Sequence, residues 1–114
     1  MTSSSKIPYS DFEKLDLRVG TIIEVADHPK ADKLYVLTVD LGEKIPRTIV
    51  AGLKTFYQKD QLKGKQAVFV SNLEPAKLRG IESNGMILAA SNENKEKVFF
   101  IQPEQEITAG SKIH

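Results

Sequence analysis

The residues best suited to chemistry gather in one stretch, residues 72–86, where hydrogen-bond donors are interspersed with glycine. Arginine can direct two parallel N–H groups onto one phosphate, and lysine adds a mobile point charge. Gly80 and Gly85 would let the backbone come close to a ligand, because glycine has no side chain. The donors of this stretch are Asn72, Lys77, Arg79, Ser83 and Asn84. The pattern indicates a loop that binds a polyanion, and the alternative is a hairpin connection with ordinary surface charges.

Basic residues are concentrated in the middle of the chain, although its net charge is only +1. Residues 44–80 carry eight Lys and Arg against two acidic residues, whereas both flanking segments are net acidic. A polarised chain of this kind can present a basic face to a polyanion even when its total charge is near zero. The alternative is a solvated segment in which the lysines occur by chance.

A smaller basic group, Lys30 and Lys33, flanks Asp32 in the loop expected after the first strand. These lysines could add positive charge to a binding surface. Asp32 could instead pair with one of them, and an exposed ion pair contributes little to stability.

Two further residues, Tyr35 and Met86, could touch a nucleic acid, whereas His28 is not expected to hold a ligand. Tyr35 could stack on a base, and Met86 could cover a sugar or base, although thioethers more often fill gaps in a core. His28 precedes Pro29 and is interpreted as a loop residue, not as a metal ligand or a base.

Motifs of catalysis and metal binding are absent from the sequence. It contains no G-x-x-x-x-G-K-[ST] loop, no G-x-S-x-G elbow and no H-E-x-x-H. Cysteine is absent, which excludes disulfides and thiolate ligands, and only two histidines are present. We therefore expect a protein that is not an enzyme and needs no metal or cofactor.

No apolar run long enough for a membrane span and no hydrophobic leader occurs, so we expect a cytoplasmic protein.

Short strands must position these residues, because apolar residues alternate with the period of half-buried strands. Strands are predicted from Leu17 to about His28 and over residues 34–41, 47–53, 66–72, 86–91 and 98–102. Gly20 predicts a bulge or tight bend, Asn84-Gly85 predicts a hairpin turn, and residues 54–59 predict a short helix. Residues 10–13 have the S-x-x-E form of a capping box, which predicts a helical turn. Residues 1–9 are predicted to be a flexible lead-in to one domain, residues 10–114.

This order of elements fits an all-β fold, a five-stranded Greek-key barrel of the OB type with a helix between strands three and four. Extra N- and C-terminal segments would flank the barrel. OB barrels bind nucleic acids at the loops after strands one and four, where Lys30, Lys33 and residues 72–86 fall. The pattern alone also allows an SH3-like barrel or a small sandwich.

Six blocks of the chain carry a resemblance to a known family: DLRVG (16–20), HPKADKLY (28–35), VDLG (39–42), RTIVAGL (47–53), NLEPAKLRG (72–80) and SNGM (83–86). In this order they resemble the tRNA-binding domain family. Its members include the C-terminal domain or separate β subunit of methionyl-tRNA synthetase, free-standing tRNA-binding proteins, and the domain of the endothelial monocyte-activating cytokine precursor. The resemblance runs from about Phe12 to Ile113.

The resemblance implies an OB fold that binds tRNA at its outer corner without reading its sequence. It also implies a non-catalytic partner or subunit of an aminoacyl-tRNA synthetase, with methionyl-tRNA synthetase expected, and a homodimer built from segments outside the barrel. Carried over residue by residue, the tRNA contacts are Lys33, Asn72, Lys77, Arg79, Ser83 and Met86, with Lys30, Tyr35 and Asn84 as further candidates.

Two alternative functions remain open at this point. A bacterial secretion chaperone shares the fold, but its loop resembles A-R-x-P-A rather than ADKL at residues 31–34, and it lacks the SNGM pattern. The chain could also be a protein-interaction or dimerisation module in which RNA binding is secondary. Its acidic end segments and the apolar Phe12, Ile107 and Ile113 motivate that reading.

Overall fold

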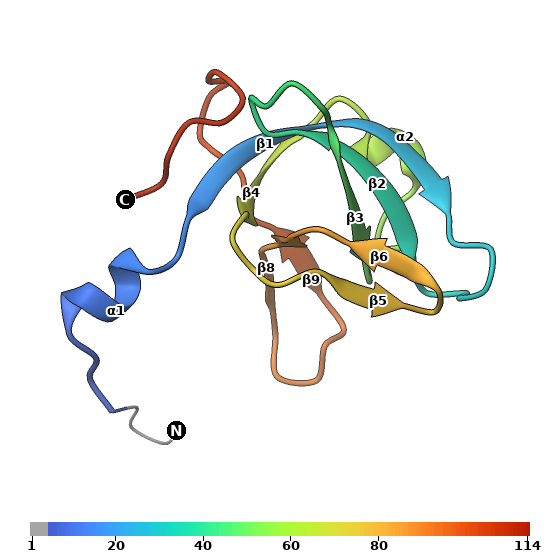
Figure 1. Ribbon diagram of the computed structural model, residues 1–114. Helices are drawn as coiled ribbons and strands as arrows, with labels where there is room; N and C mark the ends of the chain where they lie inside the picture. Colours follow the sequence, from blue (N-terminus) through green and yellow to red (C-terminus); the bar gives the residue numbers. More distant parts are fainter. Residues whose placement is uncertain (1–4) are drawn as a thin grey trace.

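A small antiparallel β-barrel forms the centre of the molecule in the computed structural model, which describes residues 5–114 (Figure 1). The barrel strands are hydrogen-bonded in the order β3-β2-β1-β4-β7. Their bounds are β1 Leu17–Asp27, β2 Tyr35–Asp40, β3 Arg47–Ala51, β4 Gln66–Val70 and β7 Met86–Ile87. This nearly closed barrel confirms the predicted all-β OB fold.

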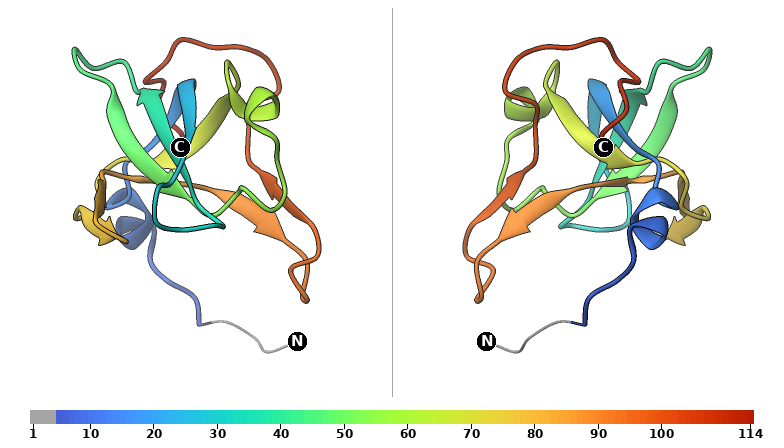
Figure 2. Two further views of the ribbon diagram at one scale, coloured as in Figure 1. Left: turned by 90° about the vertical axis from the view of Figure 1, so that its right-hand side faces the viewer. Right: turned by 90° about the vertical axis from the view of Figure 1, so that its left-hand side faces the viewer.

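Two short helices and two hairpins are attached to the barrel. Helix α1 (Tyr9–Glu13) precedes it and α2 (Lys59–Leu62) connects β3 to β4. One hairpin consists of β5 (Ala76–Leu78) and β6 (Ile81–Ser83), the other of β8 (Ala89–Ser91) and β9 (Val98–Phe100). The two hairpins lie on different sides of the barrel (Figure 2). Within residues 5–114, neither helix is long and apolar enough to cross a membrane.

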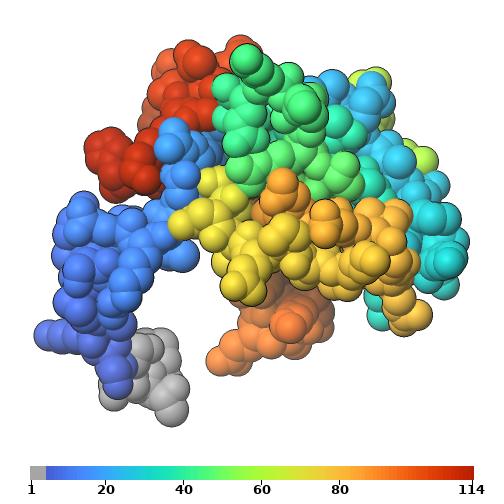
Figure 3. Space-filling view, viewed as in Figure 1, coloured from blue at the N-terminus to red at the C-terminus, as the bar shows by residue number. Residues whose placement is uncertain are grey.

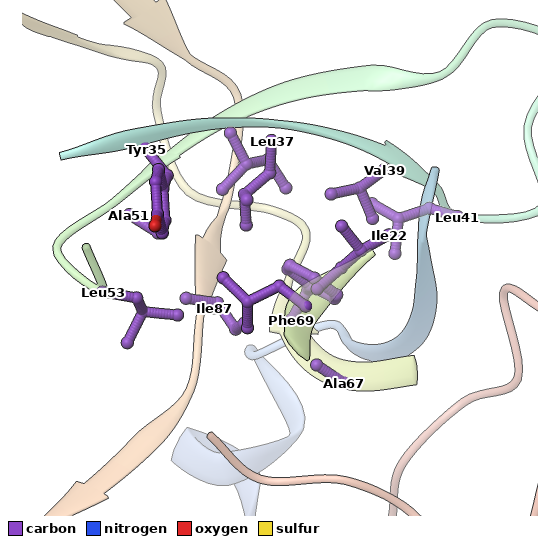
Figure 4. Packing of buried hydrophobic residues seen from close by; sticks show 12 residues of the cluster. Ile22, Tyr35, Leu37, Val39, Leu41, Ala51, Leu53, Ala67, Phe69 and Ile87 are labelled. Carbon is purple, nitrogen blue, oxygen red and sulfur yellow. The ribbon is translucent and has the colours of Figure 1, made fainter. Parts of the chain in front are cut away.

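The core fills the barrel with alternate side chains of its strands, as the period of two requires. Along β2, every second residue is buried, beginning with Tyr35 and continuing through Leu37 and Val39. Phe69 of β4 lies among them and is fully buried (Figure 4). The interior is therefore occupied by side chains.

Gly20 is required by the packing of this core. A β-carbon at this position would lie 2.7–2.9 Å from side-chain atoms of three core residues, Val39, Leu41 and Phe69. The bulge that was predicted at Gly20 occurs instead in the β1–β2 pairing, between Ile22 and Glu24. The glycine therefore makes room for core side chains and does not mark the irregularity of the strand.

Both helices differ in detail from the predictions. Helix α2 begins at Lys59, not Lys54, because the Gln58 N–H donates to Gln61 Oε1 at 2.7 Å and caps the helix there. Helix α1 confirms the predicted helical turn, but its N-cap is Pro8 and no side chain caps it. Of the predicted lead-in, residues 1–4 lie outside the described residues, and Tyr9 already belongs to α1.

The hairpin turn lies at Arg79-Gly80, so its prediction at Asn84-Gly85 was wrong. Leu78 pairs with Ile81, and the two residues between them have φ of 54° and 92°. Positive φ at both positions is what a two-residue turn of type I′ requires.

The segment after this hairpin also differs from the predicted single strand over residues 86–91. It divides because β7 pairs with β4, whereas β8 pairs with β9. Gly85, which separates β6 from β7, lies against the barrel, since a β-carbon there would approach Ile49 and the Val70 carbonyl oxygen at 3.1 Å.

Candidate nucleic-acid interface

The β5–β6 hairpin and the β1–β2 loop (residues 28–34) lie beside each other at one edge of the barrel (Figure 3). Four cationic side chains occur on these two segments: Lys30, Lys33, Lys77 and Arg79, which we call the basic rim. A surface hollow between the segments is lined by residues 30–34 of the loop and by Arg79. The fold thus brings together two basic groups that lie more than 40 positions apart in the sequence.

The cations of the basic rim are exposed and available to a ligand. None of them takes part in the ion pairs found among residues 5–114. Carboxylates do occur nearby: Asp32 lies in the same loop, and Glu82 is directly opposite Lys77 in the hairpin. Neither carboxylate forms an ion pair with a cation of the basic rim, so the positive charge of the rim is available to an anionic ligand.

Several other cations of the basic middle segment are engaged within the protein. Lys54 and Lys59 lie 3.1 and 2.9 Å from the two carboxylate oxygens of Asp27, and Lys63 lies 3.2 Å from Glu24. Hydrogen bonds from Lys59 and Lys54 lower the pKa of Asp27 below its usual value. The high charge of residues 44–80 therefore overstates the basic surface.

Arg47 is likewise a structural cation. Its guanidinium holds both carboxylate oxygens of Glu43, each at 2.8 Å, and this bonding lowers the pKa of Glu43. Another of its N–H groups donates to the Ser71 carbonyl oxygen. The residue thereby ties the β2–β3 connection to the end of β4.

Arg79 occupies an unusual backbone conformation at the tip of the hairpin. Its φ of 54° lies in the left-handed region, which costs about 1–2 kcal/mol for a residue with a β-carbon. The type I′ turn requires this conformation, and Lys95 has a similar φ of 56° in the β8–β9 connection. The turn thus holds an exposed arginine at the tip of the hairpin.

Asn72 is held away from the rim by the N-terminal segment. Its Nδ2 donates to the Lys14 carbonyl oxygen at 2.6 Å, and its Oδ1 accepts from the Asp16 N–H at 2.8 Å. Both ends of the amide are thus engaged in holding residues 14–16 to the chain that follows β4. The structure does not place Asn72 with the four cations.

Ser83 and Asn84 help to close the barrel between β3 and the β6–β7 segment. The buried Ser83 hydroxyl accepts from the Val50 N–H at 2.9 Å and donates to the Gly85 carbonyl oxygen at 3.0 Å. The Asn84 N–H donates to the Thr48 carbonyl oxygen at 2.8 Å. The Ser83 proton is therefore already used within the protein.

The two apolar candidates differ in their exposure. Tyr35 is 4% exposed and its hydroxyl donates to the Tyr57 carbonyl oxygen at 2.7 Å, so its ring belongs to the core and has no free face for a base. Met86 is 45% exposed on β7 and can cover a sugar or base.

His28 is a component of this site that sequence reasoning missed. Its imidazole is buried, and its Nε2 lies 2.9 Å from the Leu78 carbonyl oxygen, one residue before Arg79. The two residues are 50 positions apart, so no local pattern could have revealed the contact. His28 therefore connects the β1–β2 loop to the hairpin.

A family model and curated proteins match most of this chain. A family model described as "Putative tRNA binding domain" matches residues 17–112. The methionine–tRNA ligases of Pyrococcus horikoshii and Methanococcoides burtonii are 53% and 48% identical over 107 and 108 residues, which covers 94% and 95% of this chain. The chain spans only 14% and 16% of the length of those two relatives.

Solved structures with the same fold carry different functional names. A MetRS-related protein from P. horikoshii has a TM-score of 0.90 and 32% identity, with 97% of this chain and 100% of that chain covered. The chaperone CsaA from Bacillus anthracis has a TM-score of 0.86 and 30% identity, with coverage of 96% and 100%. The C-terminal domain of Plasmodium vivax p43 has a TM-score of 0.83 and 34% identity, with coverage of 88% and 59%. The fold is therefore shared by proteins of more than one role.

Proposed function

This chain belongs to the tRNA-binding domain family, and from that premise we propose that it is a non-catalytic module which binds folded tRNA through the basic rim. The observation that supports this site is the juxtaposition of exposed cations on two loops, Lys30 and Lys33 on one and Lys77 and Arg79 on the other. A rim of fixed cations can recognise the spacing of phosphates in a folded RNA.

The proposed contacts divide according to whether the side chain already bonds within the protein. Arg79 and Lys77 bind phosphates from the hairpin, and Lys33 adds charge from the opposite loop, with Lys30 beside it. Met86 contacts a sugar or base. Asn72 and Ser83, whose side chains bond within the protein, act by holding the loop and the barrel in shape, and Tyr35 acts in the core. The Asn84 backbone also bonds to β3, but its side-chain amide has no hydrogen bond among residues 5–114 and stays a proposed contact. Because phosphates carry no base information, different tRNAs should bind alike.

The affinity for mixed tRNA is expected to fall steeply with salt. With roughly three to six phosphates engaged, log K should decrease with a slope of about −2 to −5 against log salt, because each contact releases condensed counterions. Filter binding across a salt series measures the slope. A plain RNA hairpin serves as the control and should bind more weakly, since it lacks the folded arrangement. A flat response, or equal affinity for the hairpin, would contradict the proposal.

We also propose that the module serves a methionyl-tRNA synthetase in the cytoplasm, either as a separate subunit or as an appended domain. The supporting observation is that the curated relatives named above are methionine–tRNA ligases, of which this chain matches about a seventh. In this role the module would increase the affinity of the synthetase for tRNA, while the chemistry would remain with the synthetase.

Self-association through the apolar ends is a second candidate function. Helix α1 has no buried residue, and Ile7 and Tyr9 are 65% and 67% exposed. The helix projects from the barrel (Figure 1). Phe12 joins α1 to an apolar cluster on the outside of the barrel, formed by Leu17, Val68 and Val70. We propose that a second copy of the chain covers the exposed side chains of Ile7 and Tyr9.

The double variant Ile7→Glu/Tyr9→Glu is expected to convert a dimer into a monomer, because it would place four carboxylates in a symmetric apolar contact. Sedimentation equilibrium measures the mass. Ile45→Glu is the matched control, since Ile45 is 77% exposed on the β2–β3 connection, away from α1. A monomeric parent chain, or a dimer that both variants retain, would contradict the proposed contact.

A further inference from the structure

We infer that His28 is a positioning residue of the interface: its ring couples the β1–β2 loop to the β5–β6 hairpin and sets the place of Lys33 relative to Arg79. The inference rests on the proposed function, because it gives His28 a role in tRNA binding. Both segments carry cations of the rim, and neither is part of the barrel sheet.

The two ring nitrogens of His28 have different partners, which assigns one tautomer to the ring. The Lys30 backbone N–H donates to Nδ1 at 3.0 Å, so Nδ1 acts as an acceptor and carries no proton. The proton of the neutral ring is then on Nε2, which lies 2.9 Å from the Leu78 carbonyl oxygen and donates to it. One imidazole therefore bonds to the loop through one nitrogen and to the hairpin through the other.

The loop side of this contact is a compact turn. The His28 N–H donates to the Leu34 carbonyl oxygen at 3.2 Å, which closes the loop at its base. The bond from Lys30 then orients the residues that lead to Lys33. A movement of the ring would therefore move the loop.

The hairpin side depends on this histidine for its connection to the loop. Strand β5 pairs only with β6 in the sheets of the described residues, and the bond to Leu78 is the one hydrogen bond found there between the hairpin and residues 28–34. Leu78 immediately precedes the turn that carries Arg79. The ring is 5% exposed, so water has little access to replace the bond.

Loss of the hydrogen bond from His28 to Leu78 should weaken tRNA binding without removing a charge. Cations that are held at a fixed spacing bind a folded polyanion with a smaller loss of conformational entropy than cations on two independent loops. The expected signature is a lower affinity at an unchanged salt slope. A lost phosphate contact would instead reduce the slope.

Two conservative variants separate the hydrogen bond of His28 to the hairpin from its hydrogen bond to the loop. In His28→Gln, the side-chain amide nitrogen can take the place of Nε2 and reach the Leu78 carbonyl oxygen. In His28→Asn, the side-chain oxygen can take the place of Nδ1 and accept from Lys30, but no donor reaches the hairpin. We expect affinity for mixed tRNA to fall about five- to tenfold in His28→Asn and to stay within about twofold of the parent in His28→Gln. Filter binding over a salt series measures both affinity and slope.

Nuclear magnetic resonance of the free protein tests the geometry independently of RNA. The ring should show the Nε2–H tautomer in long-range proton–nitrogen spectra. The amide signals of Arg79 and Gly80 should shift in His28→Asn and remain near their parent positions in His28→Gln. Since the same samples are used, a variant that fails to fold is recognised directly from its spectrum.

The outcomes distinguish the inference from the proposed function. If the parent chain binds no tRNA, the proposed function fails, and the tautomer and the amide shifts still decide whether His28 couples the two segments. If the parent binds tRNA but His28→Asn binds as tightly as His28→Gln, the positioning role is overturned. An Nδ1–H tautomer in the parent, or unchanged Arg79 and Gly80 signals in His28→Asn, would overturn it as well.

Discussion

Replacing Lys33, Lys77 and Arg79 together by alanine is expected to weaken tRNA binding about 100- to 1,000-fold in about 0.1 M salt. Each phosphate contact contributes about 0.9 to the salt slope of a duplex, which corresponds to about eightfold in affinity at that salt concentration. Three contacts therefore account for about 500-fold, and the slope itself should become shallower by about 2 to 3. Filter binding of mixed tRNA across a salt series measures both quantities.

A second triple variant with the same change in net charge controls for general attraction. Lys44, Lys65 and Lys95 are exposed and form no ion pair among residues 5–114, and they lie on the β2–β3 connection, before β4 and in the β8–β9 turn. The β8–β9 hairpin is on a different side of the barrel from β5–β6 (Figure 2). We expect this variant to lose much less affinity. Equal losses in the two triple variants would show that binding is diffuse and not located at the basic rim.

Arg79 offers a cleaner single test, because alanine keeps the β-carbon and hence the cost of the left-handed backbone. Any loss of affinity in Arg79→Ala then reports on the guanidinium and not on the turn. The cost of the left-handed backbone is the same in both proteins, because arginine and alanine each carry a β-carbon at a φ of 54°.

Gly20→Val is expected to destabilise the protein by more than about 3 kcal/mol, a large fraction of the 5–15 kcal/mol typical of small domains. Its β-carbon alone would lie within 3 Å of three core side chains, and the filled barrel leaves them little room to move. Gly20→Ala should cost about 1–3 kcal/mol for the same reason. Urea unfolding followed by circular dichroism measures the change in free energy.

Gly52 is the matched control for this overpacking. A β-carbon at Gly52 would meet only Leu34 Cδ2 at 3.9 Å, an ordinary van der Waals distance. Gly52→Ala should therefore change stability by no more than about 0.5 kcal/mol. If Gly20→Ala and Gly52→Ala unfold at the same urea concentration, Gly20 does not have the packing role assigned to it.

The sequence alone was sufficient for the fold because its signals are local and repeated. Apolar residues on alternate positions identify β1 and β2, and the buried residues of β2 follow that alternation without exception, whereas β3 and β4 are short continuous apolar runs. The six blocks of family resemblance indicated the same barrel, and they also identified which loops carry the cations. Helix α2 was expected between β3 and β4, although its starting residue was displaced by the Gln58 cap.

The contacts of single residues were decided by tertiary structure, since their partners are distant in the chain. Asn84-Gly85 has the composition of a hairpin turn, but β7 pairs with β4 and leaves the turn to Arg79-Gly80. Composition also cannot tell that Asp27 engages two of the lysines in the basic segment.

In the candidate site, too, some residues could be predicted from the sequence and others only from the tertiary structure. Lys33, Lys77 and Arg79 could be selected by residue type, because a cation on an exposed loop needs no partner to be recognised. Burial of Tyr35 and the bridge from His28 to Leu78 depend on strands and loops that meet only after the barrel closes. Residue types and their spacing thus determined the barrel and the positive charge of the basic rim, while long-range hydrogen bonds and packing decided which of the candidate side chains are exposed.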